Sequence, residues 1–179
     1  MSAPLFKDVS IIDWFYEAVQ GVYNAGLVEG YPSGNYLPSR LIQRDEAAKI
    51  LSIAHAEASA AKLYKEKTGK DATNEQVAYL AEQIIDSLWK QWQSTNPTYT
   101  YVVYSDVPVS AWSGKYVLYA YNAKLVKGRT IGTETIFAPA DQITRAETAV
   151  LVDRIITSLN ITYPVVENED GSYSVVLTK

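Results

Sequence analysis

An arginine opens a helical segment at a position where positive charge is usually disfavoured. Arg145 stands in the stretch Ile-Thr-Arg-Ala-Glu (143–147), where Thr144 and Glu147 have the spacing of a capping box. The box predicts a helix that begins at Thr144, so that Arg145 projects from the first turn beside unpaired N–H groups. An arginine fork at a helix N-terminus suits a carboxylate or another anion. We therefore predict that Arg145 binds an anionic ligand, which neutralises a charge that the helix dipole disfavours.

Arg145 has a counterpart because the chain contains an internal repeat of about fifty residues. The segment 6–31 aligns with 104–129, and after a three-residue insertion 37–51 aligns with 138–152. The aligned pairs include Asp8 and Asp106, Trp14 and Trp112, Gly30 and Gly128, Arg44 and Arg145, and Glu46 and Glu147. We predict that Arg44 binds an anion in the same way as Arg145, with a weaker helix cap.

An ion pair is the structural alternative for each arginine. Arg44 and Arg145 could pair with Asp8 and Asp106, the aspartates near the start of the two repeats, and so tie each repeat together. The two roles are compatible if the aspartate orients the arginine and the ligand approaches the other side of the guanidinium group.

Tryptophans and glycines of the repeat are further candidates for ligand contact. Trp14 and Trp112 could stack on a sugar ring, but a tryptophan that leads a helix with apolar neighbours more often belongs to the core, which we favour. Gly30 and Gly128 permit close approach of a ligand to the backbone, or a turn with positive φ, and we favour the turn.

Polar residues beside these glycines complete the candidate set. Tyr31, Lys127 and Arg129 flank Gly30 and Gly128. They are either contacts to a polymeric ligand or solvated loop residues.

Composition excludes several classes of function. The 179 residues are 47% apolar, enough for one domain with a core or two small ones. The net charge is −4 without a basic run, which argues against a nucleic-acid partner. The chain has no cysteine and one histidine, and it lacks a P-loop, a G-x-S-x-G motif and a metal-ligand cluster. We therefore expect neither an enzyme nor a bound metal or cofactor.

Fourteen tyrosines and four tryptophans are unusual for this length, and such amphipathic rings favour binding faces and sugar contacts as well as cores. No stretch approaches the roughly 20 apolar residues of a membrane span. The stretch "MSAPLFKDVS" lacks the charged and apolar regions of a signal peptide. We expect either that a precursor's signal has been removed or that the protein leaves the cell by another route.

Each repeat predicts two helices joined by a glycine-rich turn. The first helix starts near the tryptophan, and the second starts at Arg44 or Thr144. We expect the two second helices to pack centrally. The one that begins at Thr144 is apolar nearly all round, as a buried helix should be.

An insert separates the repeats. The helix that begins at Arg44 should continue to Gly69, and Thr73 with Gln76 has the spacing of a capping box for a second helix over 73–92. We expect a helical hairpin packed on the core. Trp89 and Trp92 are assigned to packing, and His55 is interpreted as an ordinary helix histidine with no partner evident in the sequence.

The predicted fold class is mainly α with short β-strands. Residues 98–104 read as a short strand, and the C-terminal segment reads as a β-hairpin that turns at Asp170-Gly171, or as a linker. The predicted units are residues 1–54, 55–103, 104–158 and 159–179.

The repeats resemble the S-layer homology family. The first matches with "FKDV", Trp14, "GYPSG" and "LIQRDE", and the second with "YSDV", Trp112 and "ITRAE". The resemblance covers about 6–54 and 104–156. It implies helix-loop-helix prongs around a central helix bundle, with grooves between prongs that bind a secondary cell-wall polymer, often one that carries a pyruvate ketal.

The chain departs from this family pattern. It has two repeats where three are typical, and "GRTIGTET" replaces the Gly-Tyr-Pro turn in the second. Gln43 and Asp45 stand where threonine and alanine are usual. Either the insert helices take the place of a third prong, or another chain supplies it.

The resemblance implies a non-catalytic anchor on a bacterial cell surface or cell wall. Its partner would be an anionic cell-wall polysaccharide held by the arginines, which a pyruvate ketal would suit through its one carboxylate. The alternative is a structural or assembly module of an S-layer or a phage particle, which makes protein–protein contacts through the same fold.

Overall fold

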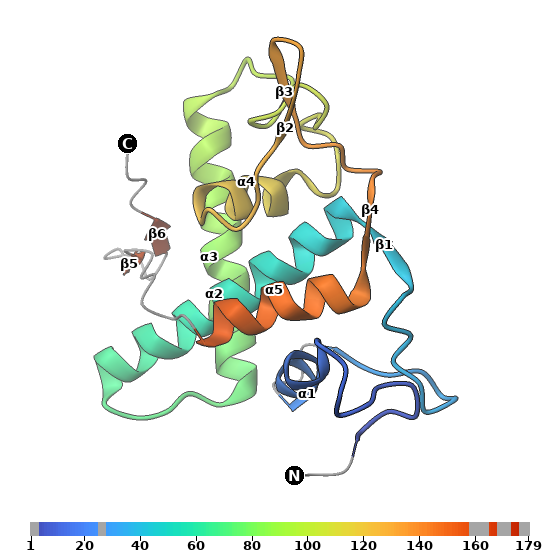
Figure 1. Cartoon of the computed structure of the whole chain (residues 1–179). Coiled ribbons are helices and arrows are strands. Elements are labelled where there is room, and N and C mark those ends of the chain that lie inside the picture. The colour runs from blue at the N-terminus through green and yellow to red at the C-terminus, as the bar shows by residue number, and fades with distance from the viewer. Residues whose placement is uncertain (1–3, 25–27, 158–164, 168–172, 176–179) are drawn as a thin grey trace.

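One long helix, α2 (Arg44–Thr68), runs through the centre of this computed structural model (Figure 1). The structure describes residues 4–24, 28–157, 165–167 and 173–175. Alanine, lysine and glutamate, all strong helix formers, dominate the sequence of α2. Gly69 ends the helix with a φ of 71°, the left-handed conformation that glycine adopts without steric cost. The predicted extension of this helix to Gly69 is therefore confirmed.

The helices pack across the repeats. The first helix of each repeat, α1 (Tyr16–Asn24) or α4 (Gly114–Asn122), lies against the second helix of the other repeat. Thus α1 packs on α5 (Arg145–Thr157), and α4 packs on α2. Figure 1 shows α2 and α5 side by side, which confirms their predicted central packing.

The insert forms the second half of a helical hairpin, α3 (Asn74–Thr95). Thr73 and Gln76 form the predicted capping box: the Thr73 Oγ1 accepts from the Gln76 N–H, and the Gln76 Oε1 accepts from the Thr73 N–H. Helix α3 packs on both α2 and α4. The hairpin therefore lies against the core, as the sequence predicts.

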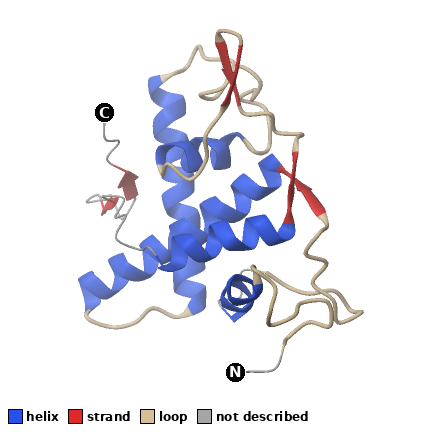
Figure 2. Cartoon of the chain, viewed as in Figure 1, coloured by secondary structure: helices blue, strands red, loops and turns tan. Residues whose placement is uncertain are grey.

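The strands are short and form antiparallel pairs in the segments between and after the helices (Figure 2). The described pairs are β1 (Leu41–Gln43) with β4 (Gln142–Thr144), β2 (Arg129–Ile131) with β3 (Glu134–Ile136), and β5 (Val165–Glu167) with β6 (Tyr173–Val175). The mainly α fold class with short strands and a C-terminal hairpin is confirmed. The predicted turn at Asp170-Gly171 lies outside the described residues.

The predicted strand over 98–104 is wrong. Its described pairing is a single bridge between Tyr101 and Pro108. The segment bends because Val103 has a φ of 58° and the Tyr104 N–H donates to the Val102 carbonyl. Val102 and Tyr104 are buried in the core, while Val103 between them is exposed.

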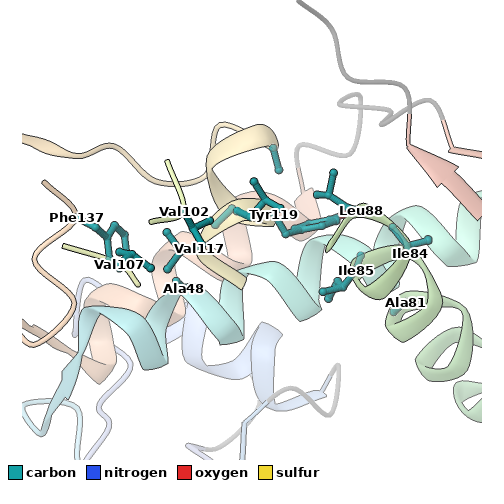
Figure 3. Packing of buried hydrophobic residues seen from close by; sticks show 14 of the residues in the cluster. Ala48, Ala81, Ile84, Ile85, Leu88, Val102, Val107, Val117, Tyr119 and Phe137 are labelled. Carbon is teal, nitrogen blue, oxygen red and sulfur yellow. The ribbon is translucent and has the colours of Figure 1, made fainter. Parts of the chain in front are cut away.

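Two hydrophobic clusters form the core, and α2 contributes to both. The larger cluster fills the space between α2, α3 and α4, where Ile84, Ile85 and Leu88 cover the predicted apolar face of α3 (Figure 3). The smaller cluster joins α1, α5 and the other face of α2. Trp89 and Trp92 are partly buried against the larger cluster with stacked rings, which confirms their packing role.

Two expectations about burial are wrong. Trp14 and Trp112 are 69% and 55% exposed, because α1 and α4 begin two residues after them and neither tryptophan joins the buried helical face. Helix α5 is not buried all round: Val150, Leu151 and Ile155 are only partly buried. Among the described helices, α1 and α2 pack on α5, and their contacts leave these three residues partly buried.

His55 is a buried polar residue of the core. It is 2% exposed, and its Nδ1 lies 2.9 Å from the Tyr119 hydroxyl of α4. The sequence indicated an ordinary helix histidine with no partner, so the contact with Tyr119 was not predicted. Burial lowers the pKa of His55 to about 4, because the charged imidazolium loses its hydration inside the core.

The pKa of His55 predicts acid destabilisation. The unfolded chain takes up the proton near pH 6.5 and the folded chain only near pH 4, so stability is full above pH 6.5 and falls as the pH drops towards 4. The total loss is about 3 kcal/mol. Urea unfolding between pH 7.5 and 4 measures it, and His55→Gln, which retains a polar group near Tyr119, should flatten the profile over that interval. An unchanged slope in the variant would contradict this assignment.

Candidate functional site

The two predicted arginines reach across to the loop of the opposite repeat. The Arg145 Nε and Nη2 donate to the carbonyls of Tyr36 and Glu29, each at 3.0 Å. The Arg44 Nε and Nη2 donate to the carbonyls of Phe137 and Lys127, at 3.0 and 3.1 Å. We call residues 28–40 loop 1 and residues 126–141 loop 2. Site 1 is Arg145 with loop 1, and site 2 is Arg44 with loop 2.

Aspartates hold the same loops from the other side. The two Asp8 carboxylate oxygens accept from the backbone N–H groups of Tyr36 and Leu37, at 2.7 and 2.8 Å. Asp106 accepts from Phe137 and Ala138 in the same way, at 2.8 and 2.7 Å.

These contacts correct the predicted ion pair within each repeat. The carboxylates of Asp8 and Asp106 bind backbone N–H groups, and the guanidinium groups of Arg44 and Arg145 bind backbone carbonyls of the other repeat. The arginines therefore tie the repeats to each other. The sequence could not show this, because alignment reveals equivalent positions but not which copy they face.

Backbone strain explains why a carboxylate is needed in each loop. Leu37 and Ala138 have φ values of 58° and 57°, a left-handed conformation that residues other than glycine rarely adopt. This conformation costs roughly 1–2 kcal/mol. The charged hydrogen bonds from Asp8 and Asp106 to these two N–H groups offset that cost.

The first N–H groups of α5 and α2 are paired, so the predicted unpaired groups beside each arginine are wrong. Arg145 and Ala146 donate to the carbonyls of Arg40 and Pro38, at 2.9 and 3.0 Å. Reciprocally, the N–H groups at the start of α2 donate to loop 2: Arg44 to Asp141 and Asp45 to Pro139. The described helix starts are thus occupied by the opposite repeat and are not open for an anion.

The capping box at α5 is confirmed. The Thr144 N–H donates to the Glu147 Oε2 at 2.8 Å, and the Glu147 N–H donates to the Thr144 Oγ1 at 3.1 Å. At α2 the Gln43 N–H donates to the Glu46 Oε2 at 3.0 Å. Both boxes fix the first turn and so the direction in which each arginine leaves its helix.

Aromatic rings of the loops cover one face of each guanidinium group. Arg145 lies 4.4 Å from the Tyr36 ring centre and 5.3 Å from that of Tyr31, and Arg44 lies 5.0 Å from that of Phe137. Sequence reasoning missed Tyr36 and Phe137. Their signal is an aromatic residue two positions before the matched prolines in both repeats. These cation–π contacts and the carbonyl acceptors compensate a positive charge that the helix dipole disfavours.

Each arginine retains donors for a ligand. A guanidinium group has five N–H donors, and within the described residues the side chain of Arg44 or Arg145 uses its Nε and one Nη2 donor. Within the described residues, the Nη1 group of each arginine makes no hydrogen bond to the protein. Burial, followed by the charge of Arg129, lowers the pKa of Arg44, so a nearby anion would relieve an unfavourable charge there.

The remaining charges differ between the sites. In site 1 the guanidinium group of Arg40 lies 5.2 Å from the Tyr31 ring centre and donates to the Tyr31 hydroxyl. In site 2 Arg129 forms an ion pair with Asp141. Beside Arg44 lies a cavity of about 240 Å³ between α2, α5 and loop 2.

The predicted glycines serve the packing of their own repeats. Neither Gly30 nor Gly128 has positive φ, so the favoured turn is wrong; the positive-φ loop glycines are Gly34 and Gly132. A Cβ on Gly30 would lie 2.3 Å from the Phe6 ring, and one on Gly128 would lie 2.5 Å from the Tyr104 ring.

The other predicted residues have different relations to the arginines. Tyr31 lies against Arg145, and Lys127 borders Arg44 through its backbone carbonyl. The described ring contacts of Trp14 and Trp112 are local, with Phe15 and Tyr116. They do not bring either tryptophan to an arginine.

A sequence model of the S-layer homology domain matches residues 5–48 and 103–149, slightly more than half of the chain. The chain belongs to the S-layer homology family. The two matched segments coincide with the two repeats, in which the arginine of each repeat binds the loop of the other. The chain is also similar to the surface-layer 125 kDa protein of Lysinibacillus sphaericus, with 39% identity over 46 residues, which is 26% of the chain and 4% of that protein.

Membership of this family defines the general role of the chain. S-layer homology domains are non-catalytic modules of the bacterial cell surface, and the chain is such a cell-surface anchoring module. Among the described helices, none is long and apolar enough to cross a membrane. The described residues also contain no cluster of histidine, aspartate and glutamate side chains suited to a metal ion.

The exchange of arginines predicts a specific pattern of energetic coupling. Asp106 accepts from the Phe137 N–H, and Arg44 donates to the Phe137 carbonyl. Asp106→Ala and Arg44→Ala should therefore each lower the free energy of unfolding by about 1–3 kcal/mol. The double variant should lose less than the sum by at least about 0.5 kcal/mol. The pair Asp8→Ala and Arg145→Ala should show the same coupling. For Asp8→Ala with Arg44→Ala, the stability losses of the single variants should add in the double variant.

Urea unfolding of the single and double variants measures these terms. Asp71→Ala is a matched control, because its carboxylate is largely exposed in an ion pair with Lys65 and should contribute little. If Asp8 is energetically coupled to Arg44 and not to Arg145, the aspartate and arginine act together within one repeat, which contradicts this prediction.

Proposed function

We propose that the chain anchors its protein by binding an anionic cell-wall polysaccharide at sites 1 and 2. The observation that carries the proposal is the position of the two guanidinium groups, each fixed by two carbonyls and an aromatic face with its Nη1 edge left for a ligand. A carboxylate, such as that of a pyruvate ketal, can accept two hydrogen bonds from the Nη1 and Nη2 groups of one guanidinium.

Preorganisation supports this role. The arginine side chains are held by the fold before a ligand arrives, so binding does not incur the rotamer entropy that a free arginine would lose. In site 1 a second cation, Arg40, and the Tyr31 ring lie beside Arg145. That combination suits a sugar ring with an attached anion, because tyrosine offers an apolar face and a polar edge.

Calorimetric titration tests the proposal. Purified bacterial wall polymer, with and without its pyruvate groups, is titrated into wild type, Arg44→Ala and Arg145→Ala. We expect binding that requires the ketal and weakens by about 1.5–3 kcal/mol when the arginine of an occupied site is lost, the range for a hydrogen bond to a charged group.

Because each arginine also supports a loop, a structural control is needed. Asp8→Ala and Asp106→Ala loosen the same loops from the opposite side without removing a ligand donor. Each should bind the polymer more tightly than the arginine variant of the same site. Equal losses would mean that the arginines act only through the loops, and absence of binding by folded wild type would refute the proposal for that polymer.

An assembly role is the second candidate, and exposed apolar residues favour it. Ile11, Ile12 and Trp14 precede α1 and are 50%, 88% and 69% exposed. Exposed apolar side chains that lie this close together in the chain are typical of protein–protein contacts. Sedimentation of wild type and Ile12→Ser/Trp14→Ser separates the two candidates, because assembly requires association that the variant loses while an anchor remains unaffected.

A further inference from the structure

A cavity beside α4 borders loop 2 and has neither Arg44 nor Arg145 in its lining. It has a volume of about 530 Å³ and opens between the end of α4, loop 2 and β3. Its lining includes Tyr104, Tyr121, Asn122, Lys124, Lys127 and Thr135. We call it the loop-2 pocket. Its volume falls within the range of about 300–1,000 Å³ that is typical of small-molecule sites.

Two lysines, Lys124 and Lys127, line the loop-2 pocket. Within the part of the chain that the structure describes, neither the Lys124 nor the Lys127 side chain forms an ion pair, whereas the nearby Arg129 does. Two ammonium groups in a concave surface attract an anion and can donate to a carboxylate.

Aromatic and amide groups in the pocket suit a sugar ring. Tyr121 is 47% exposed, and its ring packs edge-on against Tyr104, so it presents a supported aromatic surface. The Asn122 Nδ2 donates to the Leu118 carbonyl at 2.8 Å, which fixes the carboxamide and leaves its oxygen as an acceptor. A pyranose has an apolar face for the ring and hydroxyl donors for the amide.

The first repeat lacks this charge at the equivalent positions. Tyr23 and Asn24 match Tyr121 and Asn122, but Gly26 and Glu29 stand where the second repeat has Lys124 and Lys127. Lys124 also has a φ of 58°, a conformation in which glycine would be more stable. Lys124 forms the left-handed cap that ends α4, where its N–H donates to the Tyr121 carbonyl and the Leu125 N–H donates to the Ala120 carbonyl.

We infer that the loop-2 pocket is a second saccharide subsite, specific for a sugar that carries a carboxylate. The inference rests on the proposed function, which it extends from a terminal anion to a neighbouring sugar of the same polymer. Lys127 connects the two, because its carbonyl accepts from Arg44 in site 2 while the residue also lines the pocket. A polymer bound at Arg44 can therefore continue into the pocket.

A titration followed by NMR tests the subsite in the full chain. Methyl β-D-glucuronide is added to the ¹⁵N-labelled protein, with methyl β-D-glucoside and sodium acetate as comparison ligands. We expect saturable shifts of the amide signals of residues 121–128 and 135 with the glucuronide. Affinity should be at least about tenfold lower for each comparison ligand, as expected when one charged or stacking contact worth about 1.4 kcal/mol is lost.

Variants separate the pocket from general electrostatics. Lys124→Gln/Lys127→Gln should lower the affinity at least about tenfold. The matched control Lys62→Gln/Lys90→Gln removes the same charge from exposed positions on α2 and α3 and should leave the affinity unchanged. Equal losses in both variants, equal affinity for acetate, or shifts confined to residues around Arg44 and Arg145 would overturn the inference.

The two experiments distinguish failure of the pocket as a subsite from failure of the chain as an anchor. If wall polymer binds in the calorimeter but causes no shifts at residues 121–128, the anchor stands and the subsite is refuted. If the polymer does not bind but the glucuronide fills the pocket, the anchor proposal fails and the pocket stands as an independent site for acidic sugars.

Discussion

Hydrogen bonds exchanged between the two repeats are the constraint on which the structure depends. Strands β1 and β4 pair antiparallel with Ile42 opposite Ile143, so each following helix begins directly beside the other repeat's loop. The first N–H groups of α2 and α5 find their acceptors there, and so do the side chains of Arg44 and Arg145. A buried helix start without such partners would be costly, so neither repeat completes its hydrogen bonding alone.

The helices could be predicted from the sequence because their signals are local. Apolar spacing, the Thr73–Gln76 box and Gly69 determine α3 and the end of α2 through contacts a few residues apart. Trp14 and Trp112 show the limit of such spacing. They continue the apolar pattern in the sequence, but the helices begin two residues later, and this shift turns both rings towards solvent.

The arginine sites were predictable in position but not in connectivity. The capping box correctly places Arg145 at a helix start, but the partners of its side chain depend on a strand pairing between residues about one hundred positions apart. The same limit applies to Gly30 and Gly128. Their role depends on aromatic rings that fold back from Phe6 and Tyr104, which no local turn rule describes. Tertiary packing therefore decided the partners of the arginines and the role of these glycines.

The crossing of helices also governs how the module bears load, which is a requirement for any tether. Helix α5 is joined to loop 1 of the opposite repeat by the Arg145 side chain and by the β1–β4 ladder, and it also packs on α1 and α2. Force on one repeat is thus shared with the other, and no single hydrogen bond carries it alone. Separating the repeats requires loss of the paired strands and of both arginine contacts, so we expect the two units to respond to force as one mechanical element.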